Sequence, residues 1–283
     1  MRFAITAADR GRSVFEALVA AGWTPVKLFT NPPTPFGPNA GMVARAMELK
    51  LPVQSSAIDS GDLADLAARG CDALICAGYD WRIPDWRPHL RYAVNFHPAP
   101  LPEARGPYPA FQALLEGRER WAVSCHQIEP TFDTGAVLAE EAFDLAEDEC
   151  HESLGLKAQM AQGRLARRLA RDFETLWREA KPQVGGGYWR RLTDADREID
   201  FTRPVDHILR QVRAFGLTET IAKVNGSTLY VRRAVGWREA HGLAPGTLAF
   251  TSGRQWVVAA LDGYVGLIEW SPVSLGQREL IGR

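Results

Sequence analysis

Short apolar runs and amphipathic stretches alternate through the first half of the chain. The apolar runs predict strands over residues 2–7, 26–30, 52–54, 72–78 and 93–97. Apolar residues that recur every three or four positions predict helices over residues 12–22, 41–50, 61–70 and 108–117. This alternation is typical of parallel β/α units. We therefore expect an α/β fold, namely a Rossmann-like, mostly parallel sheet with helices on both faces.

Beyond residue 120 the pattern changes to two β-like runs and one long helix. The two runs, at residues 121–129 and 135–145, flank a turn at residues 130–135. A helix from about residue 152 to 180 is predicted because five apolar residues repeat at helical spacing: Leu165, Leu169, Phe173, Leu176 and Trp177. The opposite face carries Arg164, Arg167, Arg168 and Arg171. We favour a solvated face for these arginines over a binding patch for an anionic ligand.

The segment "KPQVGGGYW", residues 181–189, interrupts the helical pattern with a proline and three glycines, and we interpret it as a linker. A helix over residues 204–215 follows. Three turn signals then separate apolar or β-branched runs: Asn225-Gly226, Ser252-Gly253 and Asp262-Gly263. We therefore expect a Rossmann-like domain over residues 1–184 and a small antiparallel β domain, OB-like and weakly basic, over residues 185–283.

The composition excludes several classes of protein. With 33 basic and 34 acidic residues among 283, the net charge is −1, so no overall field draws the protein toward nucleic acid or a membrane surface. The four cysteines form no C-x-x-C pair, and the chain starts without an apolar targeting segment. We expect a cytoplasmic protein with free thiols and no membrane partner.

Asn95 and His97 end the predicted fifth strand, at the edge where open parallel sheets bind ligands. Side chains two positions apart on a strand point the same way, so an amide donor and a group that titrates near neutral pH can grip one carbonyl oxygen. A stiff extended loop follows because three of its residues are prolines: Pro98, Pro100 and Pro102. Asp133, in the turn "FDTG", is a carboxylate that can orient the His97 imidazole.

Other site types lack their motifs. The first turn reads "TAADRGRS" without G-x-G-x-x-G, which argues against NAD binding. The phosphate-binding loop, the nucleophile elbow and H-E-x-x-H are also missing from the sequence. A zinc site built from His97, Cys125, His126 and Asp133 lacks the ligand spacing of metal sites, so we expect no metal.

The motif Asn95-x-His97, the following "LPEARG" and the later "FDTG" together resemble the folate-dependent formyltransferases. The segment "DALICAGYDWRIP" is similar to the family's folate-pocket strand and loop. The region from about Arg190 is similar to the C-terminal domain of methionyl-tRNA and aminosugar formyltransferases. The resemblance therefore covers nearly the whole chain.

This resemblance implies transfer of a formyl group from 10-formyltetrahydrofolate, a co-substrate, to a primary amine through a tetrahedral intermediate. Asn95 and His97 would hold the formyl oxygen, and Asp133 would orient His97 and help to remove a proton from the amine. By the same resemblance, three residues would lie beside the pterin: Gly78, Tyr79 and Ile83. The sequence departs from the family at Ala99 and Pro100, where serine and leucine are frequent.

The acceptor is the open part of this hypothesis. Lys and Arg dominate contacts with nucleic acid, and in the tRNA-acting relatives the loop after the second strand is long and basic. Residues 30–41 contain neither residue type here. We therefore expect a small-molecule amine acceptor and no nucleic acid: a nucleotide-linked amino sugar first, then a siderophore or peptide amine. Methionyl-tRNA is the alternative. A 10-formyltetrahydrofolate hydrolase and a non-catalytic binding module are the rival classes, and a homodimer is compatible with the sequence.

Overall fold

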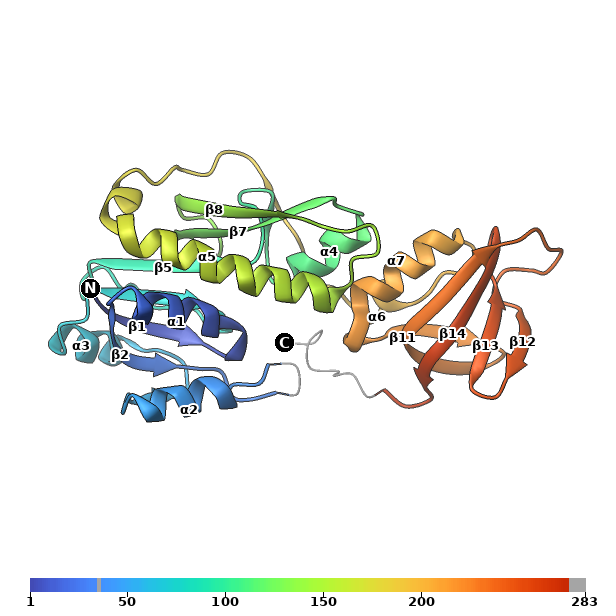
Figure 1. Ribbon diagram of the computed structural model, residues 1–283, viewed down its shortest axis with the longest axis horizontal. Coiled ribbons are helices and arrows are strands. Elements are labelled where there is room, and N and C mark those ends of the chain that lie inside the picture. Colours follow the sequence, from blue (N-terminus) through green and yellow to red (C-terminus); the bar gives the residue numbers. More distant parts are fainter. Residues whose placement is uncertain (35–36, 275–283) are drawn as a thin grey trace. The chain divides into compact units, whose positions relative to one another are not determined.

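The computed structural model describes residues 1–34 and 37–274, so two residues of the loop 30–41 and the last nine of the chain lie outside the description (Figure 1). Contacts group the chain into two compact units. Unit 1 comprises Met1–Gly106, Arg120–Phe143 and Leu156–Tyr188, and unit 2 comprises Pro107–Glu119, Asp144–Gly155 and the chain from Trp189 onward. The predicted domain boundary between residues 184 and 185 stays a prediction.

Unit 1 is built on a seven-stranded sheet in the order β3-β2-β1-β4-β5-β7-β8. The strands are β1 (Arg2–Ala7), β2 (Thr24–Phe29), β3 (Val53–Gln54), β4 (Ala73–Ala77), β5 (Tyr92–His97), β7 (Arg120–Gln127) and β8 (Val137–Asp144). The strands from β1 to β5 pair in parallel, and β7 runs antiparallel to β5. The predicted mostly parallel sheet is therefore confirmed, with strand ends shifted by one or two residues.

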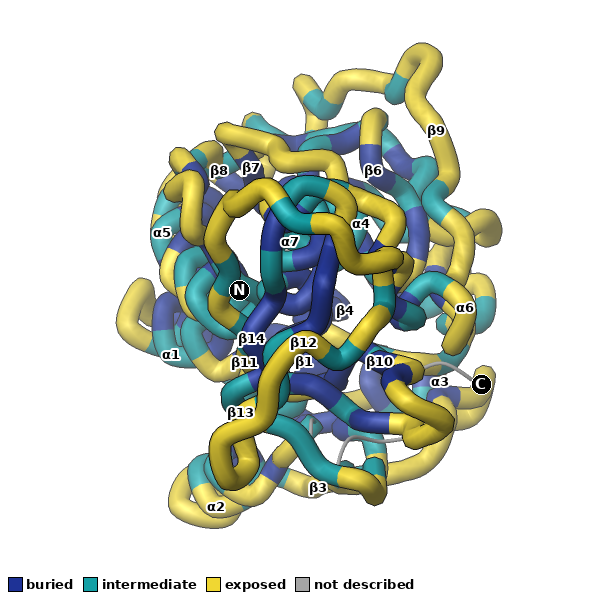
Figure 2. Tube along the Cα trace, turned by 90° about the vertical axis from the view of Figure 1, so that its right-hand side faces the viewer, coloured by how far each residue is buried: buried dark blue, intermediate teal, exposed yellow. Residues whose placement is uncertain are grey.

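Helices cover both faces of this sheet, as predicted. The helices are α1 (Arg12–Ala20), which follows the 3-10 turn η1 (Asp9–Gly11), α2 (Ala40–Glu48), α3 (Ser60–Ala68) and α5 (His151–Arg178). Phe15 of α1, Met42 of α2 and Leu165 of α5 share one apolar core, whereas Leu63 and Leu66 of α3 belong to a core on the other face. Strand β4 is buried at all five of its residues and is dark blue in Figure 2. Within the described part of the chain, no helix is both long and apolar enough to cross a bilayer.

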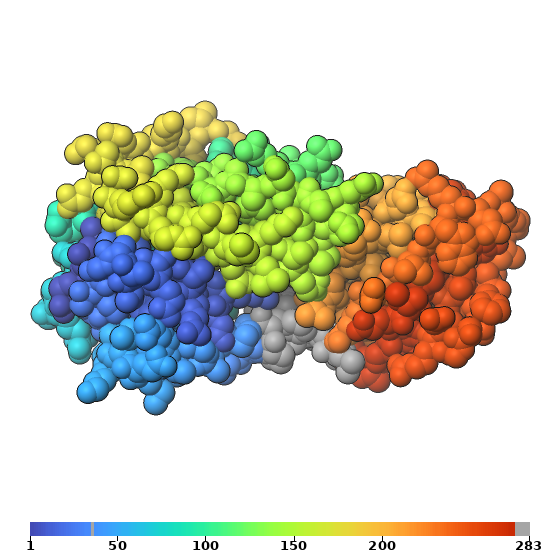
Figure 3. Space-filling model, in the orientation of Figure 1, coloured from blue at the N-terminus to red at the C-terminus, as the bar shows by residue number. Residues whose placement is uncertain are grey.

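Helix α5 packs directly on α1, and the two lie side by side at the surface (Figure 3). The Ser13 hydroxyl donates to the Gln159 carbonyl oxygen at 2.7 Å, which joins the two helices. On the arginine-bearing face, the Arg164 guanidinium lies 2.7 Å from the Glu141 carboxylate, and Arg168 lies 3.9 Å from the same carboxylate. Glu141, which belongs to β8, therefore neutralises part of the positive charge on this face. The helix is interrupted at Asp172, where φ is −126° and ψ is 24°.

Unit 2 contains a five-stranded antiparallel sheet in the order β10-β11-β14-β13-β12. Its elements are α4 (Pro109–Leu115), α6 (Asp194–Arg197), α7 (Val205–Phe215), the 3-10 turn η2 (Gly216–Thr218), β10 (Thr220–Val224), β11 (Ser227–Arg238), β12 (Leu248–Ser252), β13 (Gln255–Ala259) and β14 (Gly263–Ser271). Helix α7 packs Val205, Ile208 and Val212 into the same core as the strands. The predicted antiparallel domain is confirmed, and the Asn225-Gly226 turn takes positive φ at both residues, as a tight hairpin requires.

The segment interpreted as a linker is tied to unit 1. Lys181 forms a β-bridge with Val137, and β9 (Gly187–Tyr188) pairs in parallel with β6 (Ala104–Arg105). Gly186 has φ +80°, and a Cβ there would lie 2.0 Å from the Pro102 carbonyl oxygen. Gly186 therefore allows the close approach of two backbones. The linker interpretation of residues 181–189 stays a prediction, because unit 1 ends at Tyr188 and unit 2 resumes at Trp189, inside this segment.

Candidate active site

The candidate site lies at the carboxyl end of β5, in the middle of the unit 1 sheet. Asn95 pairs with Cys76 of β4 on one side and with His126 of β7 on the other. His97 pairs with Ser124 of β7. The strand order reverses between β1 and β4, and β5 is the neighbour of β4. Ligands bind at the carboxyl edge near such a point in open α/β sheets.

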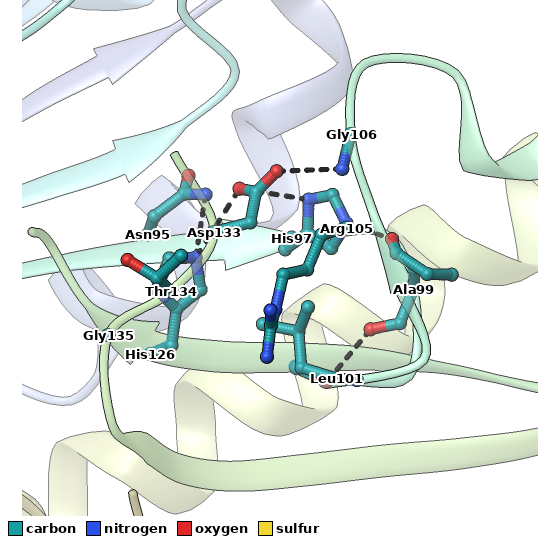
Figure 4. Close-up of polar contacts among 12 residues, drawn as sticks. Asn95, His97, Ala99, Leu101, Arg105, Gly106, His126, Asp133, Thr134 and Gly135 are labelled. Atoms are coloured by element: carbon teal, nitrogen blue, oxygen red, sulfur yellow. Dashed lines mark hydrogen bonds and ion pairs between the residues drawn. The ribbon is translucent and has the colours of Figure 1, made fainter. Parts of the chain in front are cut away.

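His97 is 5% exposed, and both of its ring nitrogens face protein atoms (Figure 4). Nε2 lies 2.8 Å from the Ala104 carbonyl oxygen, and Nδ1 lies 3.4 Å from Oδ1 of Asp133. A carbonyl oxygen only accepts hydrogen bonds, so Nε2 carries a proton. In the neutral imidazole, Nδ1 therefore presents its lone pair toward the carboxylate. Burial lowers the pKa of His97, although the Asp133 charge opposes this shift, so the neutral form is favoured.

Acid should destabilise the protein through His97. Because burial lowers its pKa in the folded state, the folded protein binds this proton more weakly than the unfolded chain does. Above about pH 6.5 the neutral His97 imidazole leaves the folded protein at its full stability. This part of the free energy of unfolding is lost as the pH falls through the folded-state pKa of His97. We expect urea unfolding between about pH 7 and pH 5 to show a steeper loss of stability in the wild type than in His97→Gln. Parallel pH profiles for the two proteins would contradict a buried neutral imidazole.

Asp133 is held in place by two hydrogen bonds, one to its side chain and one to its backbone. Its φ is +58°, a left-handed conformation that needs support in a residue with a side chain. The Gly106 N–H donates to Oδ2 at 3.0 Å, and the Gln183 amide donates to the Asp133 carbonyl oxygen at 2.8 Å. Burial alone would raise the pKa of the Asp133 carboxyl, but hydrogen bonding at the carboxylate, including that from the Gly106 N–H, holds that pKa below its ordinary value. The side chain is therefore an ionised carboxylate beside His97.

Asn95 is joined to this pair through His126, for which the sequence predicted no role in acid–base or oxyanion chemistry. Its Nδ2 lies 3.1 Å from Nε2 of His126, and the same His126 nitrogen lies 3.7 Å from Oδ1 of Asp133. The three predicted catalytic residues thus gather in one cluster, with His126 as the fourth member. Only the pairing of Asn95 with His126 across β5 and β7 brings this histidine to the site, and spacing along the chain does not reveal that pairing.

The proline-rich loop after β5 is fixed to β7. The Ser124 hydroxyl donates to the Ala99 carbonyl oxygen at 2.8 Å and accepts from the Leu101 N–H at 3.0 Å. The Trp121 indole donates to the Pro98 carbonyl oxygen at 2.8 Å. These bonds set the position of Ala104, whose carbonyl oxygen meets His97. The loop therefore acts as a rigid support for the imidazole.

The zinc arrangement considered from the sequence does not fit this geometry. Cys125 and His126 are adjacent on β7, so their side chains point to opposite faces of the sheet. Cys125 lies in the apolar core, where burial raises the pKa of its thiol. No group of three or more His, Cys, Asp or Glu residues placed to hold a metal occurs in the described ranges. All four cysteines are free thiols, as predicted.

The residues expected beside the pterin follow β4 at the same edge of the sheet. Gly78 has φ +107°, and a Cβ there would meet nothing within 4 Å. The Tyr79 hydroxyl accepts from the Ile58 N–H at 2.8 Å and donates to the Ser56 carbonyl oxygen at 3.1 Å. Ile83 packs against the core on the α3 face. The Tyr79 hydroxyl is therefore already paired within the protein, and these three residues stay predictions as folate contacts.

Gly135 fixes the turn that carries Asp133. A Cβ at this position would lie 1.9 Å from the Gln127 carbonyl oxygen, which is backbone and cannot turn away. We expect Gly135→Ala to lower the free energy of unfolding by about 2–3 kcal/mol. The matched control is Gly155→Ala in α5, where a Cβ meets nothing within 4 Å and helix propensity favours alanine by about 1 kcal/mol. Urea unfolding of both variants measures the difference. Equal stabilities would contradict the tight approach of Gly135 to β7.

Comparison with known proteins shows to which family this chain belongs. A family model described as formyl transferase matches residues 3–167, and a model of the formyl transferase C-terminal domain matches residues 191–274. The methionyl-tRNA formyltransferase of Roseobacter denitrificans is 30% identical over 238 residues, which cover 76% of each chain. That of Variovorax paradoxus is 28% identical over 281 residues, which cover 90% of this chain and 86% of the relative.

Two solved structures share the fold of this chain. The crystal structure of WlaRD, a sugar 3N-formyl transferase with dTDP and 5-N-formyl-THF, superimposes with a TM-score of 0.69 at 13% identity and covers 95% of this chain and 97% of WlaRD. HypX from Aquifex aeolicus in complex with tetrahydrofolic acid gives a TM-score of 0.64 at 20% identity, covering 95% of this chain and 44% of HypX. The resemblance drawn from the motifs is confirmed. The chain belongs to the formyl transferase family and is a 10-formyltetrahydrofolate-dependent N-formyltransferase.

Proposed function

We propose that this enzyme formylates the α-amino group of methionyl-tRNA by direct attack of the amine on the formyl carbon. The names of the relatives at about 30% identity support this acceptor, and the alignments with three of them cover 76–90% of this chain and 76–86% of theirs. The relatives thus favour the alternative over the nucleotide-linked amino sugar preferred from the sequence. The cluster of Asn95, His97, His126 and Asp133 is the observation that carries formyl transfer itself.

A small amine is the second candidate acceptor, and one observation favours it. Residues 30–41, which follow β2, contain no Lys or Arg, so this segment offers no cation to a phosphate backbone. Within the described residues, the Asn39 side chain donates to the Asn31 carbonyl oxygen at 2.8 Å, and the Asn31 side chain accepts from the Asp80 N–H at 3.3 Å. The polar groups of this segment are used to fold it. A nucleotide-linked amino sugar remains the leading small acceptor.

Asn95 is the proposed donor to the formyl oxygen. One N–H of its amide is directed at His126, which leaves the second N–H for the oxygen that gains negative charge in the tetrahedral intermediate. His97 was expected from the sequence to share this task. Its Nε2, however, is taken by the Ala104 carbonyl oxygen, so we assign His97 to proton transfer instead.

The His97–Asp133 pair is the proposed proton acceptor. The neutral amine forms a bond to the formyl carbon, and the C=O electrons move to oxygen. The ammonium proton then passes to the Asp133 carboxylate and on to Nδ1 of His97, 3.4 Å away, where the resulting imidazolium is stabilised by the carboxylate. When the intermediate collapses, the C–N10 bond breaks and N10 takes up the proton. The products are tetrahydrofolate and the N-formyl amine, and the pair returns to its starting state.

Release of tetrahydrofolate tests this function. The purified enzyme is mixed with 10-formyltetrahydrofolate and, in turn, with methionyl-tRNA, dTDP-linked amino sugars, hydroxyornithine or no acceptor. Release is followed by absorbance, and the formylated product is identified by mass spectrometry. Release with methionyl-tRNA alone supports the first acceptor, and release with an amino sugar alone supports the second. Release without any amine indicates a hydrolase, and donor binding without turnover in every mixture indicates a binding module. Either of these last two results would overturn the proposal.

A further inference from the structure

His126 lies where its ring can set the orientation of the Asn95 side-chain amide. Its Nδ1 lies 2.7 Å from the Gln127 carbonyl oxygen, and its Nε2 lies 3.1 Å from the Asn95 amide nitrogen. The ring is 2% exposed, so water does not compete freely for either nitrogen. Since a carbonyl oxygen only accepts, Nδ1 carries the proton, and Nε2 of the neutral ring is a bare acceptor.

An unprotonated Nε2 decides which end of the Asn95 amide faces His126. The oxygen and nitrogen of an asparagine amide have nearly the same shape, so hydrogen bonding alone decides which end faces which neighbour. Only the NH₂ end satisfies an acceptor at Nε2. Within the described residues, the Asn95 side chain makes no other hydrogen bond. His126 is thus the one neighbour in this part of the chain that sets the orientation of the amide.

The nearby carboxylate explains why this orientation matters. Oδ1 of Asp133 lies 3.7 Å from Nε2 of His126, on the side where Asn95 also meets this nitrogen (Figure 4). An amide released from His126 would be free to turn an N–H group toward this carboxylate, which lies next to the same nitrogen. The formyl oxygen would then lose its donor, and Asp133 would lose part of its attraction for the His97 proton.

We propose that His126 is a positioning residue that fixes the Asn95 amide with one N–H on Nε2 and the other directed at the formyl oxygen. This inference rests on the proposed role of Asn95 in formyl transfer. It predicts that the residue at position 126 must offer a hydrogen-bond acceptor four bonds from its Cα. Glutamine meets this requirement through Oε1, whereas leucine has a similar size and no acceptor.

Two substitutions test the inference. His126→Leu should lower kcat at saturating 10-formyltetrahydrofolate by about 10- to 100-fold, which is part of the loss expected from removing an oxyanion donor entirely. His126→Gln should recover most of that loss. In an Asn95→Ala background, His126→Leu should cost less than about threefold, because the amide that it positions is gone. His89→Leu, a histidine outside the cluster, is the matched control. Equal losses for leucine and glutamine, or full additivity with Asn95→Ala, would overturn the inference.

A spectroscopic readout separates this inference from the proposed function. The ¹⁵N shifts of the His126 ring, assigned by comparison with His126→Gln, should report a protonated Nδ1 and an unprotonated Nε2 in the wild-type protein. A protonated Nε2 at neutral pH would overturn the inference whatever the activity. If the wild type releases no tetrahydrofolate with any acceptor, the proposed function fails, and the shifts still decide the state of His126. If the wild type is active and His126→Leu matches it, the inference alone fails.

Discussion

Replacing Asp133 by asparagine is expected to lower turnover by about 10³-fold while the protein stays folded. The substitution removes the negative charge that stabilises the His97 imidazolium, since Oδ1 lies 3.4 Å from Nδ1. It keeps an oxygen that can accept the Gly106 N–H and a backbone carbonyl that can accept from Gln183. The loss should therefore fall on kcat, with little change in the binding of 10-formyltetrahydrofolate or in the urea midpoint.

A surface carboxylate provides the control for this substitution. Asp85 is 63% exposed and lies 3.1 Å from Arg87, so Asp85→Asn removes the same charge without touching the cluster. Turnover should be within about twofold of the wild type, because exposed ion pairs contribute little. If Asp133→Asn retained more than about a tenth of wild-type kcat, proton acceptance by the His97–Asp133 pair would be contradicted.

Replacing Asn95 by alanine is the second large effect expected. Removing one preorganised oxyanion donor costs about 10² to 10³ in kcat, and Asn95 is the only donor that we assign to the formyl oxygen. Asn95→Asp keeps the shape but has no N–H, and it places a second carboxylate near Asp133. It should therefore be at least as inactive as Asn95→Ala. Steady-state kinetics at saturating donor measures both variants.

Thermal unfolding distinguishes this catalytic effect from a structural one. Asn95 is partly buried and makes one side-chain hydrogen bond, so its loss should cost only about 1 kcal/mol of stability. Donor affinity should change little, because the N–H gains its charged partner only in the tetrahedral intermediate. Near-normal turnover in Asn95→Ala would exclude the amide as the oxyanion donor.

The sequence predicted the elements that depend on local pattern. The strands β1, β4 and β5 and the helices α1, α3 and α7 follow from apolar periodicity, because each buries one face or both against a core. The placement of Asn95 and His97 follows equally from the strand that carries them. The approach of Asp133 to His97 was expected from the chemistry of the two side chains and supported by the family motifs, because no local pattern brings residues 36 positions apart together.

What the sequence missed depends on contacts between distant segments. His126 reaches Asn95 only through the register of β5 against β7, and a shift of one residue would point its ring to the opposite face. Gln183 holds the Asp133 turn from a segment whose glycines are typical of a flexible linker. Glycine permits close backbone packing as readily as flexibility, and composition alone does not distinguish the two.

The most direct test of the account is a single-turnover experiment with enzyme in excess over 10-formyltetrahydrofolate labelled in the formyl group, mixed with the acceptor found in the panel and quenched at set times. In the wild type, the label should move to the amine in one exponential phase, and tetrahydrofolate should appear at the same rate. In Asp133→Asn, the donor should bind equally tightly while the label stays on the folate. Transfer at equal rates in the two proteins would contradict the claim that this cluster carries out formyl transfer.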